Sequence, residues 1–384
     1  MRLLVPTNWD PALIEPLSRL EAGIELYGVL PTSLIGTGGS SPDNVDMVQG
    51  QAEEYVKRAH AAGLRFDYLL NAPSMSNMEW DYDTHRKLLE HLGWISSIDV
   101  ESVTVTIPYL VELIKRQFPR LRIRISTIAH VDSVAKASFF ELLGADCINL
   151  DFNVNRDFNT LKAIRSAVSC EIIMLANNLC LYQCPYEYYH HDGLGHASQS
   201  YNPVSGCYVD YCTIRCTLDR LRDVSQNLKC RWVRPEDLQA YEEIGIEIFK
   251  ISGRAMSSER ILNAAAAYSS GHHEGNLHDI LNVLTPKIGF INAGLPGLQS
   301  HTVASPPELR IDNQALEGFV DFFRKQNCLS ECHRCDYCRK MADKVIQFDR
   351  NEVDQYVAML TEVLHSLSGR SMFEAEAGAS KHLP

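Results

Sequence analysis

Eight short apolar segments, separated by helix-like stretches, constrain the fold of this 384-residue chain most strongly. They are rich in β-branched residues and continuously apolar, as parallel strands covered on both faces should be. The segments lie at residues 2–6, 24–30, 66–73, 102–108, 121–127, 147–151, 171–177 and 246–252. The helix-like stretches lie at 44–62, 81–93, 109–117, 132–143, 157–167 and 235–244. Eight strands alternating with helices predict an α/β fold, a TIM-like (β/α)8 barrel, with an open doubly wound sheet as the alternative.

Two further features of the sequence bear on this choice. Gly144 and Gly245 each follow a helix-like stretch, and we expect both to take the left-handed conformation that ends helices. No G-x-G-x-x-G pattern follows the first strand, so a nucleotide-binding Rossmann domain has no support.

Two regions do not fit the simple alternation of strands and helices. A cysteine-rich insertion at 178–234 separates the last two strands, and long loops in compact domains are usually functional. On a barrel this insertion would lie at the C-terminal face, where active sites are built. We therefore predict a barrel domain over 1–270 and a C-terminal extension over 271–384. In the extension, 315–327, 339–348 and 352–367 are expected to be helical, and the Pro- and Gly-rich stretch 285–311 to lie over the barrel.

The charge balance narrows the range of partners. The chain has 48 acidic and 36 basic residues, a net charge of -12. This balance removes the electrostatic attraction that supplies most nucleic-acid affinity, so nucleic acid is not expected as a partner. No apolar run approaches the ~20 residues of a membrane span, and the N-terminus does not have the features of a signal peptide. We expect a cytoplasmic protein.

Twelve cysteines are many for a cytoplasmic chain, in which thiols stay reduced and disulfides are rare. Ten of them fall in two groups, and such grouping is typical of metal sites. The two isolated cysteines, Cys147 and Cys170, adjoin apolar strands and are interpreted as core residues.

The first group contains two C-x3-C pairs within the insertion. Its members are Cys180, Cys184, Cys207, Cys212, Cys216 and Cys230. Two such pairs can place four thiolates around one centre, and soft thiolates select zinc or an iron–sulfur cluster. The spacing is looser than in zinc knuckles and suits the larger [4Fe–4S] cube.

The second group is denser. Four cysteines occupy eleven residues: Cys328, Cys332, Cys335 and Cys338. The first three have the C-x3-C-x2-C spacing of radical SAM enzymes. That motif follows the first strand of its barrel, however, and the fourth cysteine here would fill the iron position that SAM needs. We favour a fully ligated auxiliary [4Fe–4S] cluster, with structural zinc as the alternative.

Polar residues at the predicted strand ends are candidates for binding and catalysis. Asn71 and Asn177 should point toward a pocket at the barrel's C-terminal face. Asp151 and His130 are candidate acid/base groups. Lys250 and Arg254 belong to the KISGR segment that ends the last strand, and together they can bind a carboxylate, Arg254 bidentately and Lys250 as a point charge. Arg254 is thus both a catalytic and a substrate-binding candidate.

The region from the seventh strand to the eighth resembles the peptidase U32 family. The resemblance depends on LCLYQC at 179–184, on Cys212-x3-Cys216 and on KISGR at 250–254, where Ser252 stands in place of the family's Glu. It spans roughly residues 1–270. It implies a [4Fe–4S] cluster on Cys180, Cys184, Cys212 and Cys216, with Cys207 and Cys230 in reserve.

The resemblance also implies an activity. Well-understood family members hydroxylate without O2, with prephenate implicated as hydroxyl donor, and one pair of members works as a heterodimer. We therefore expect an iron–sulfur oxidoreductase, a hydroxylase of a small molecule or peptide, which can act with a protein partner as a homodimer or heterodimer. The alternatives are a U32-type hydrolase, although no protease motif is present, and a non-catalytic cluster-bearing subunit.

Overall fold

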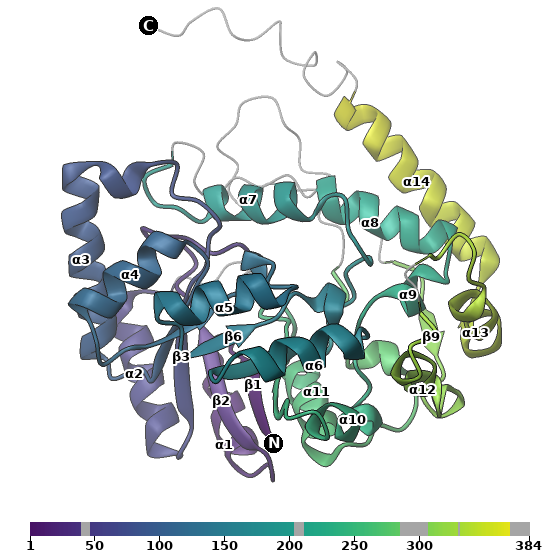
Figure 1. The fold of residues 1–384 in the computed structure, drawn as a ribbon. Helices are drawn as coiled ribbons and strands as arrows, with labels where there is room; N and C mark the ends of the chain where they lie inside the picture. Colours follow the sequence, from purple (N-terminus) through teal and green to yellow (C-terminus); the bar gives the residue numbers. More distant parts are fainter. Residues whose placement is uncertain (40–46, 203–210, 285–305, 329–330, 369–384) are drawn as a thin grey trace, which may run out of the picture.

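The protein is a closed eight-stranded barrel in a computed structural model that describes residues 1–39, 47–202, 211–284, 306–328 and 331–368 (Figure 1). All eight strands are parallel and follow the order of the sequence, and β1 pairs with both β2 and β8. The strands are β1 (Arg2–Pro6), β2 (Gly23–Gly28), β3 (Arg65–Leu70), β4 (Ser102–Val105), β5 (Arg122–Ile125), β6 (Cys147–Asn149), β7 (Glu171–Leu175) and β8 (Ile248–Lys250). The predicted (β/α)8 barrel is confirmed, and the open sheet is wrong because β8 closes onto β1.

The barrel is surrounded by helices that bury one apolar face each. They are α1 (Ile14–Ser18), α2 (Gln49–Ala61), α3 (Tyr82–Ser97), α4 (Pro108–Gln117), α5 (Val134–Leu143), α6 (Phe158–Ala167), α10 (Gln239–Glu242) and α11 (Ser258–Ser270). In α4, for example, Pro108 occupies the first turn, and Leu110, Val111 and Ile114 are buried. Gly144 and Gly245 both have positive φ, as predicted.

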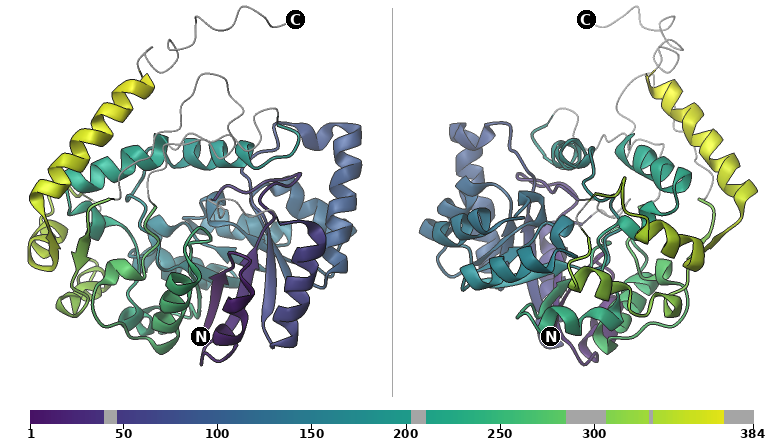
Figure 2. Two further views of the ribbon diagram at one scale, coloured as in Figure 1. Left: turned by 180° about the vertical axis from the view of Figure 1, so that it is seen from behind. Right: turned by 45° about the vertical axis from the view of Figure 1, so that its right-hand side comes forward.

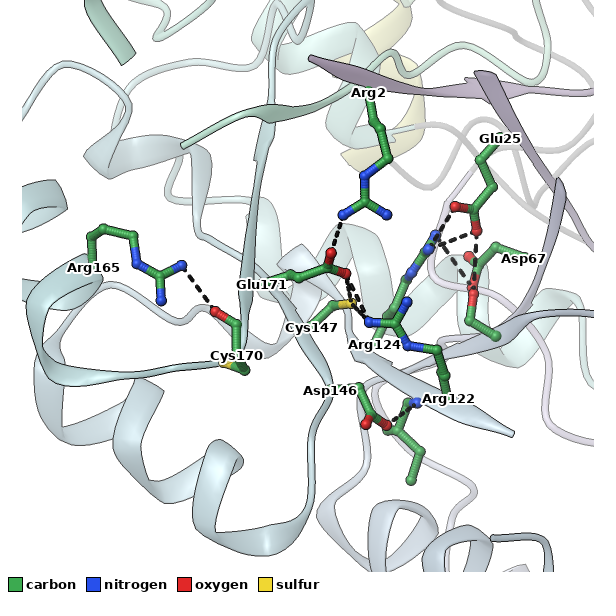
Figure 3. Close-up of polar contacts among 12 residues, drawn as sticks. Arg2, Glu25, Asp67, Arg122, Arg124, Asp146, Cys147, Arg165, Cys170 and Glu171 are labelled. Atoms are coloured by element: carbon green, nitrogen blue, oxygen red, sulfur yellow. Dashed lines mark hydrogen bonds and ion pairs between the residues drawn. The ribbon is translucent and has the colours of Figure 1, made fainter. Parts of the chain in front are cut away.

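The barrel interior contains a charged layer below the mouth. Arg124 donates to both carboxylate oxygens of Glu25 at 2.6 and 2.7 Å and lies 3.9 Å from Asp67. Figure 3 shows this cluster and, near the N-terminal ends of the strands, Glu171 with its two arginine partners. Burial raises the pKa of Asp67, and the Arg124 charge opposes that rise. Charges this deeply buried are tolerated because each has a partner of opposite sign.

The insertion between β7 and β8 is largely helical. It contains α7 (Glu187–Ala197), α8 (Tyr211–Arg222) and α9 (Gln226–Lys229). Figure 1 shows α7 and α8 lying across the barrel end opposite the N-terminus, where the strands end. The expected position at the C-terminal face is therefore confirmed, whereas the helices were not predicted. Cys207 lies outside the described residues.

The C-terminal extension packs against the insertion. Its elements are β9 (Leu309–Ile311), α12 (Phe319–Arg324), α13 (Tyr337–Val345), β10 (Ile346–Phe348) and α14 (Arg350–Ser368). Helix α14 lies beside α8, and α13 beside α9 (Figure 2). Leu316 and Val353 belong to the same apolar core as the barrel. The division of the chain at residue 270 stays a prediction.

One prediction for the extension is wrong. Residues 339–348 were expected to be one helix, but α13 ends at Val345 and the next three residues form β10. Strand β10 pairs antiparallel with β9, a partner 35 residues or more earlier in the chain, and this pairing outweighs local helix propensity. Most of the Pro- and Gly-rich stretch expected over the barrel lies outside the described residues.

Candidate functional site

Three groups of functional side chains gather at the C-terminal face of the barrel. The first is a pair of cations at the barrel mouth, the second surrounds His130, and the third is formed by cysteines of the insertion and extension. The loops after β3, β5, β6 and β8 and the insertion after β7 supply these residues, as the (β/α)8 architecture predicts.

Lys250 and Arg254 are two cations at the mouth, the first half-buried and the second buried. The Lys250 ammonium lies 4.0 Å from the centre of the Tyr27 ring, a cation–π contact. Burial lowers the pKa of Lys250 to about 8, although the Asp67 charge opposes this. Burial likewise lowers the pKa of Arg254 to about 10. Among the described residues, neither cation has a carboxylate within ion-pair distance, and Nη1 of Arg254 is buried without a hydrogen-bond partner.

Asn71 is tied into a chain of hydrogen bonds that ends at Arg254. Its amide donates to Ser126 at 3.2 Å, and its oxygen accepts from Thr37 at 2.8 Å. Arg254 donates in turn to the Thr37 hydroxyl at 3.0 Å and to the Gly39 carbonyl at 2.8 Å. Asn71 therefore positions the Arg254 guanidinium through Thr37. The nitrogen and the oxygen of the Asn71 side-chain amide each make one hydrogen bond within the protein. Its predicted contact with substrate stays a prediction.

Asn177 holds the loop that follows β8. Its side-chain oxygen accepts from the Ser252 backbone at 2.7 Å, and its nitrogen donates to the carbonyls of Ser252 and Ile280. Both ends of this amide are thus occupied by the protein itself. The loop turns at Gly253, with φ +124, where a Cβ atom would lie 2.1 Å from the Met256 sulfur. Only glycine fits there, and the turn brings Arg254 back over the mouth.

Asp151 lies in a second cluster, with His130 and Glu187. His130 Nδ1 is 3.0 Å from Asp151 Oδ2 and 3.7 Å from Glu187 Oε1. Burial works against the charged imidazole, but the Asp151 hydrogen bond and the Glu187 charge outweigh it and raise the pKa of His130. Burial raises the pKa of Glu187 to about 7. Among the described residues, the Asp151 carboxylate contacts His130 and the Asn153 backbone, not the cations at the mouth.

The first cysteine group lies next to this cluster. Burial raises the pKa of the Cys180 thiol well above its usual value, and nearby Cys216 and Cys184 raise it further. The pKa of Cys184 rises to about 12, again chiefly through burial. Cys212 precedes Cys216 by four residues on α8, so both lie on one face of that helix.

The fourth ligand of a centre here has two candidates. Buried Cys212 shares a helix face with Cys216, whereas Cys230 is fully buried and close enough to Cys216 for the two thiols to affect one another. No disulfide joins any of the cysteines that the structure describes. Neighbouring thiols of this kind fit a thiophilic metal or cluster, which binds them as thiolates.

The second cysteine group lies at the edge of the extension. Burial raises the pKa of Cys338, the guanidinium of Arg156 opposes the rise, and the thiols of Cys328 and Cys332 add to it. These three cysteines are therefore neighbours, and Cys335 belongs to the same short segment. Their donor set also fits a metal or cluster.

A cavity of about 580 Å3 is bordered by the His130 cluster and by residues of both cysteine groups. Its wall includes His130, Asp151 and Glu187, together with Cys184 of the first group and Cys328 of the second. Arg231 connects the insertion to the extension. Its guanidinium stacks 3.8 Å from the centre of the Tyr182 ring and donates a hydrogen bond to the Cys328 sulfur at 3.9 Å. The structure thus places both cysteine groups beside one cavity.

Glu187 and Arg231 were missed by the sequence analysis. Glu187 stands in an aromatic run, YEYYHH, and its acidic character among rings was the available signal. Arg231 directly follows Cys230, and a cation beside clustered thiols was the signal there.

Fold and site together define a cysteine-rich (β/α)8-barrel protein with two cations and clustered thiols at its C-terminal face. The sequence model of peptidase family U32 matches residues 43–274, and the chain belongs to that family. It is 30% identical over 334 residues to the uncharacterized protease MJ1657 of Methanocaldococcus jannaschii, covering 84% of this chain and 89% of that protein.

A protein of known structure is also similar to this chain. The U32 peptidase Mk0906 is 20% identical, with a TM-score of 0.49, covering 66% of this chain and 93% of that one. Within the described part of the chain, no helix combines the length and apolar character that crossing a membrane requires.

Proposed function

We propose that this protein is an iron–sulfur oxidoreductase that hydroxylates a small molecule or peptide without O2. The observation that carries the proposal is the clustering of Cys180, Cys184 and Cys216, of which Cys184 lines the cavity. A [4Fe–4S] cluster on these thiolates, completed by Cys212, would supply one-electron chemistry. Family membership supports the same assignment through the resemblance that the cysteine loop carries.

The barrel mouth is the site for a carboxylate-bearing hydroxyl donor such as prephenate. Lys250 Nζ and Arg254 Nη1 each have an unused donor, and their mutual repulsion is relieved when an anion binds between them. The Tyr27 ring and the loop that contains Gly39 exclude water from these cations, which strengthens the attraction. Arg254 orients the donor, and Lys250 adds a charge that depends on pH.

Electron balance favours a second redox centre. Hydroxylation of a C–H bond with oxygen at the oxidation level of water or an alcohol releases two electrons, so an electron acceptor is required. Cys328, Cys332, Cys335 and Cys338 would hold an auxiliary [4Fe–4S] cluster for this purpose, with a redox protein as the final acceptor. Support comes from Cys328, which lines the same cavity as Cys184.

The test is anaerobic purification followed by iron, sulfide and zinc analysis and EPR of the reduced protein. About eight irons and eight sulfides per chain are expected for two clusters. Alanine in place of Cys180 should then remove one cluster and alanine in place of Cys332 the other. About four irons with one zinc would make the second site structural. Iron-free protein after reconstitution would contradict the proposal.

A hydrolase is the second candidate, because the relative from Methanocaldococcus jannaschii is described as a protease. The buried His130–Asp151 pair beside the Cys184 thiol is the part of the structure that such an activity would use. Cleavage of peptides by metal-free protein, lost on Cys184→Ala, would establish it.

A further inference from the structure

His130, Asp151 and Glu187 form a compact cluster that the hydroxylase proposal leaves unused. One atom from each residue, His130 Nδ1 and a carboxylate oxygen from each acid, lies within 4.8 Å of the other two. The side chains are 10%, 6% and 7% exposed, so water screens them little. They come from the loops after β5 and β6 and from the first turn of α7, three segments that only the fold brings together.

Hydrogen bonding within the cluster is incomplete. His130 Nδ1 can carry one proton, yet it faces oxygens of two carboxylates, at 3.0 and 3.7 Å. Glu187 Oε1 is buried and has no hydrogen-bond partner among the described residues. An unpaired buried carboxylate oxygen is costly, which implies that a group is missing from the cluster.

The remaining contacts hold the ligand atoms in place. The other Asp151 oxygen, Oδ1, accepts from the Asn153 backbone at 2.7 Å, which leaves Oδ2 for His130. The Asn153 side chain also favours the charged form of Glu187 and so opposes the rise in its pKa. His130 adopts a left-handed conformation, φ 51, that is uncommon for a non-glycine residue and aims its ring at both acids. Ligand-orienting contacts of this type are typical of metal sites.

We propose that these three residues bind a divalent first-row metal ion, with an open coordination position facing the cavity. Ligand atoms at bond lengths of about 2.0–2.2 Å lie roughly 3–3.5 Å apart, close to the two distances from Nδ1. A dication also balances the two carboxylates around a neutral imidazole. All three residues line the cavity, so a water or substrate atom has access to the ion. The site is separate from the cysteine groups and does not depend on the hydroxylase proposal.

Mn2+ is the suitable probe because imidazole and carboxylates bind it, whereas thiolates prefer softer metals. The anaerobically purified holoprotein is titrated with Mn2+, and loss of the free-ion EPR signal measures binding. We expect one bound ion per chain. Glu187→Gln should weaken binding by more than about tenfold, since loss of even an outer-shell partner costs about 10–100-fold.

Asp132→Asn is the matched control. Asp132 lines the same cavity but pairs with Lys136 at 3.0 Å, so removal of its charge should leave Mn2+ affinity unchanged. Asp151→Asn serves if the Glu187 variant does not fold, because asparagine keeps the oxygen that caps Asn153. A wild-type protein that binds no Mn2+, or a folded Glu187→Gln or Asp151→Asn variant with unchanged affinity, would overturn the proposal.

Discussion

The barrel contains charged side chains in two layers, one in its interior and one at its mouth, and the two layers differ in whether each cation has an ion-pair partner. In the interior layer, Arg124 is matched by Glu25 and Asp67, and the hydroxyls of Ser102 and Thr104 complete the Asp67 carboxylate at 2.6 Å each. At the mouth, neither Lys250 nor Arg254 has a carboxylate within ion-pair distance among the described residues, although the more distant Asp67 charge acts on Lys250. The interior layer contains its own counter-charges, whereas the cations at the mouth have no ion-pair partner among the described residues and can pair with an anion.

The largest effect is expected in the interior layer. Arg124→Met should lower the free energy of unfolding by about 3–5 kcal/mol, because it leaves Glu25 and Asp67 buried without their cation. Urea unfolding of the anaerobic holoprotein, followed by circular dichroism, measures this. Lys250→Met, which removes a cation that has no ion-pair partner among the described residues, is the control and should cost less, because Asp67 keeps its closer cation, Arg124. Equal losses for both variants would show that the two layers do not differ.

The next effect concerns ligand affinity at the mouth. Arg254→Met should weaken binding of prephenate or a similar dicarboxylate by about 10–100-fold, since hydrogen bonds to charged groups contribute about 1.5–3 kcal/mol. Isothermal titration under anaerobic conditions measures the affinity. Arg165→Met is the control, because Arg165 bonds to backbone carbonyls in the loop before β7. Unchanged affinity in the Arg254 variant would place the anion elsewhere.

Dicarboxylate affinity and stability should both depend on pH through Lys250 at the mouth. The pKa of Lys250 is lowered to about 8 in the folded protein, so the lysine loses its charge above that pH and dicarboxylate affinity should fall. Stability should move the other way: between pH 8 and the ordinary lysine pKa the unfolded chain binds more protons, so this group makes folding more favourable as pH rises. Both pH dependences should vanish in Lys250→Met, and their persistence would assign them to another group.

The sequence predicted the barrel and the cations at its mouth because both depend on local patterns. Lys250 and Arg254 stand four residues apart around one strand end, so a single turn brings them together. The occupied amide of Asn177 could not be predicted, because its partner Ile280 lies 103 residues away. The role of Arg231 could not be predicted either, because its partner Cys328 lies 97 residues further along the chain. Contacts at such separations depend on the packing of the insertion and extension.

The smallest effect on the free energy of unfolding is expected for an ion pair that is only partly buried. It tests whether pairing of opposite charges contributes to stability without deep burial. Near the N-terminal ends of the strands, Glu171 pairs with Arg2 and, at 2.8 Å, with Arg122, but these side chains are 23–41% exposed. Burial opposes ionisation of Glu171, yet its hydrogen bonds and the arginine charges lower its pKa to about 2. Its contribution to stability is therefore present above the ordinary glutamate pKa and is lost as pH falls toward 2. Arg122→Met should cost less than about 1 kcal/mol at neutral pH, because solvent screens the pair. A loss as large as that of Arg124→Met would mean that charge pairing, rather than burial, decides how much each layer contributes.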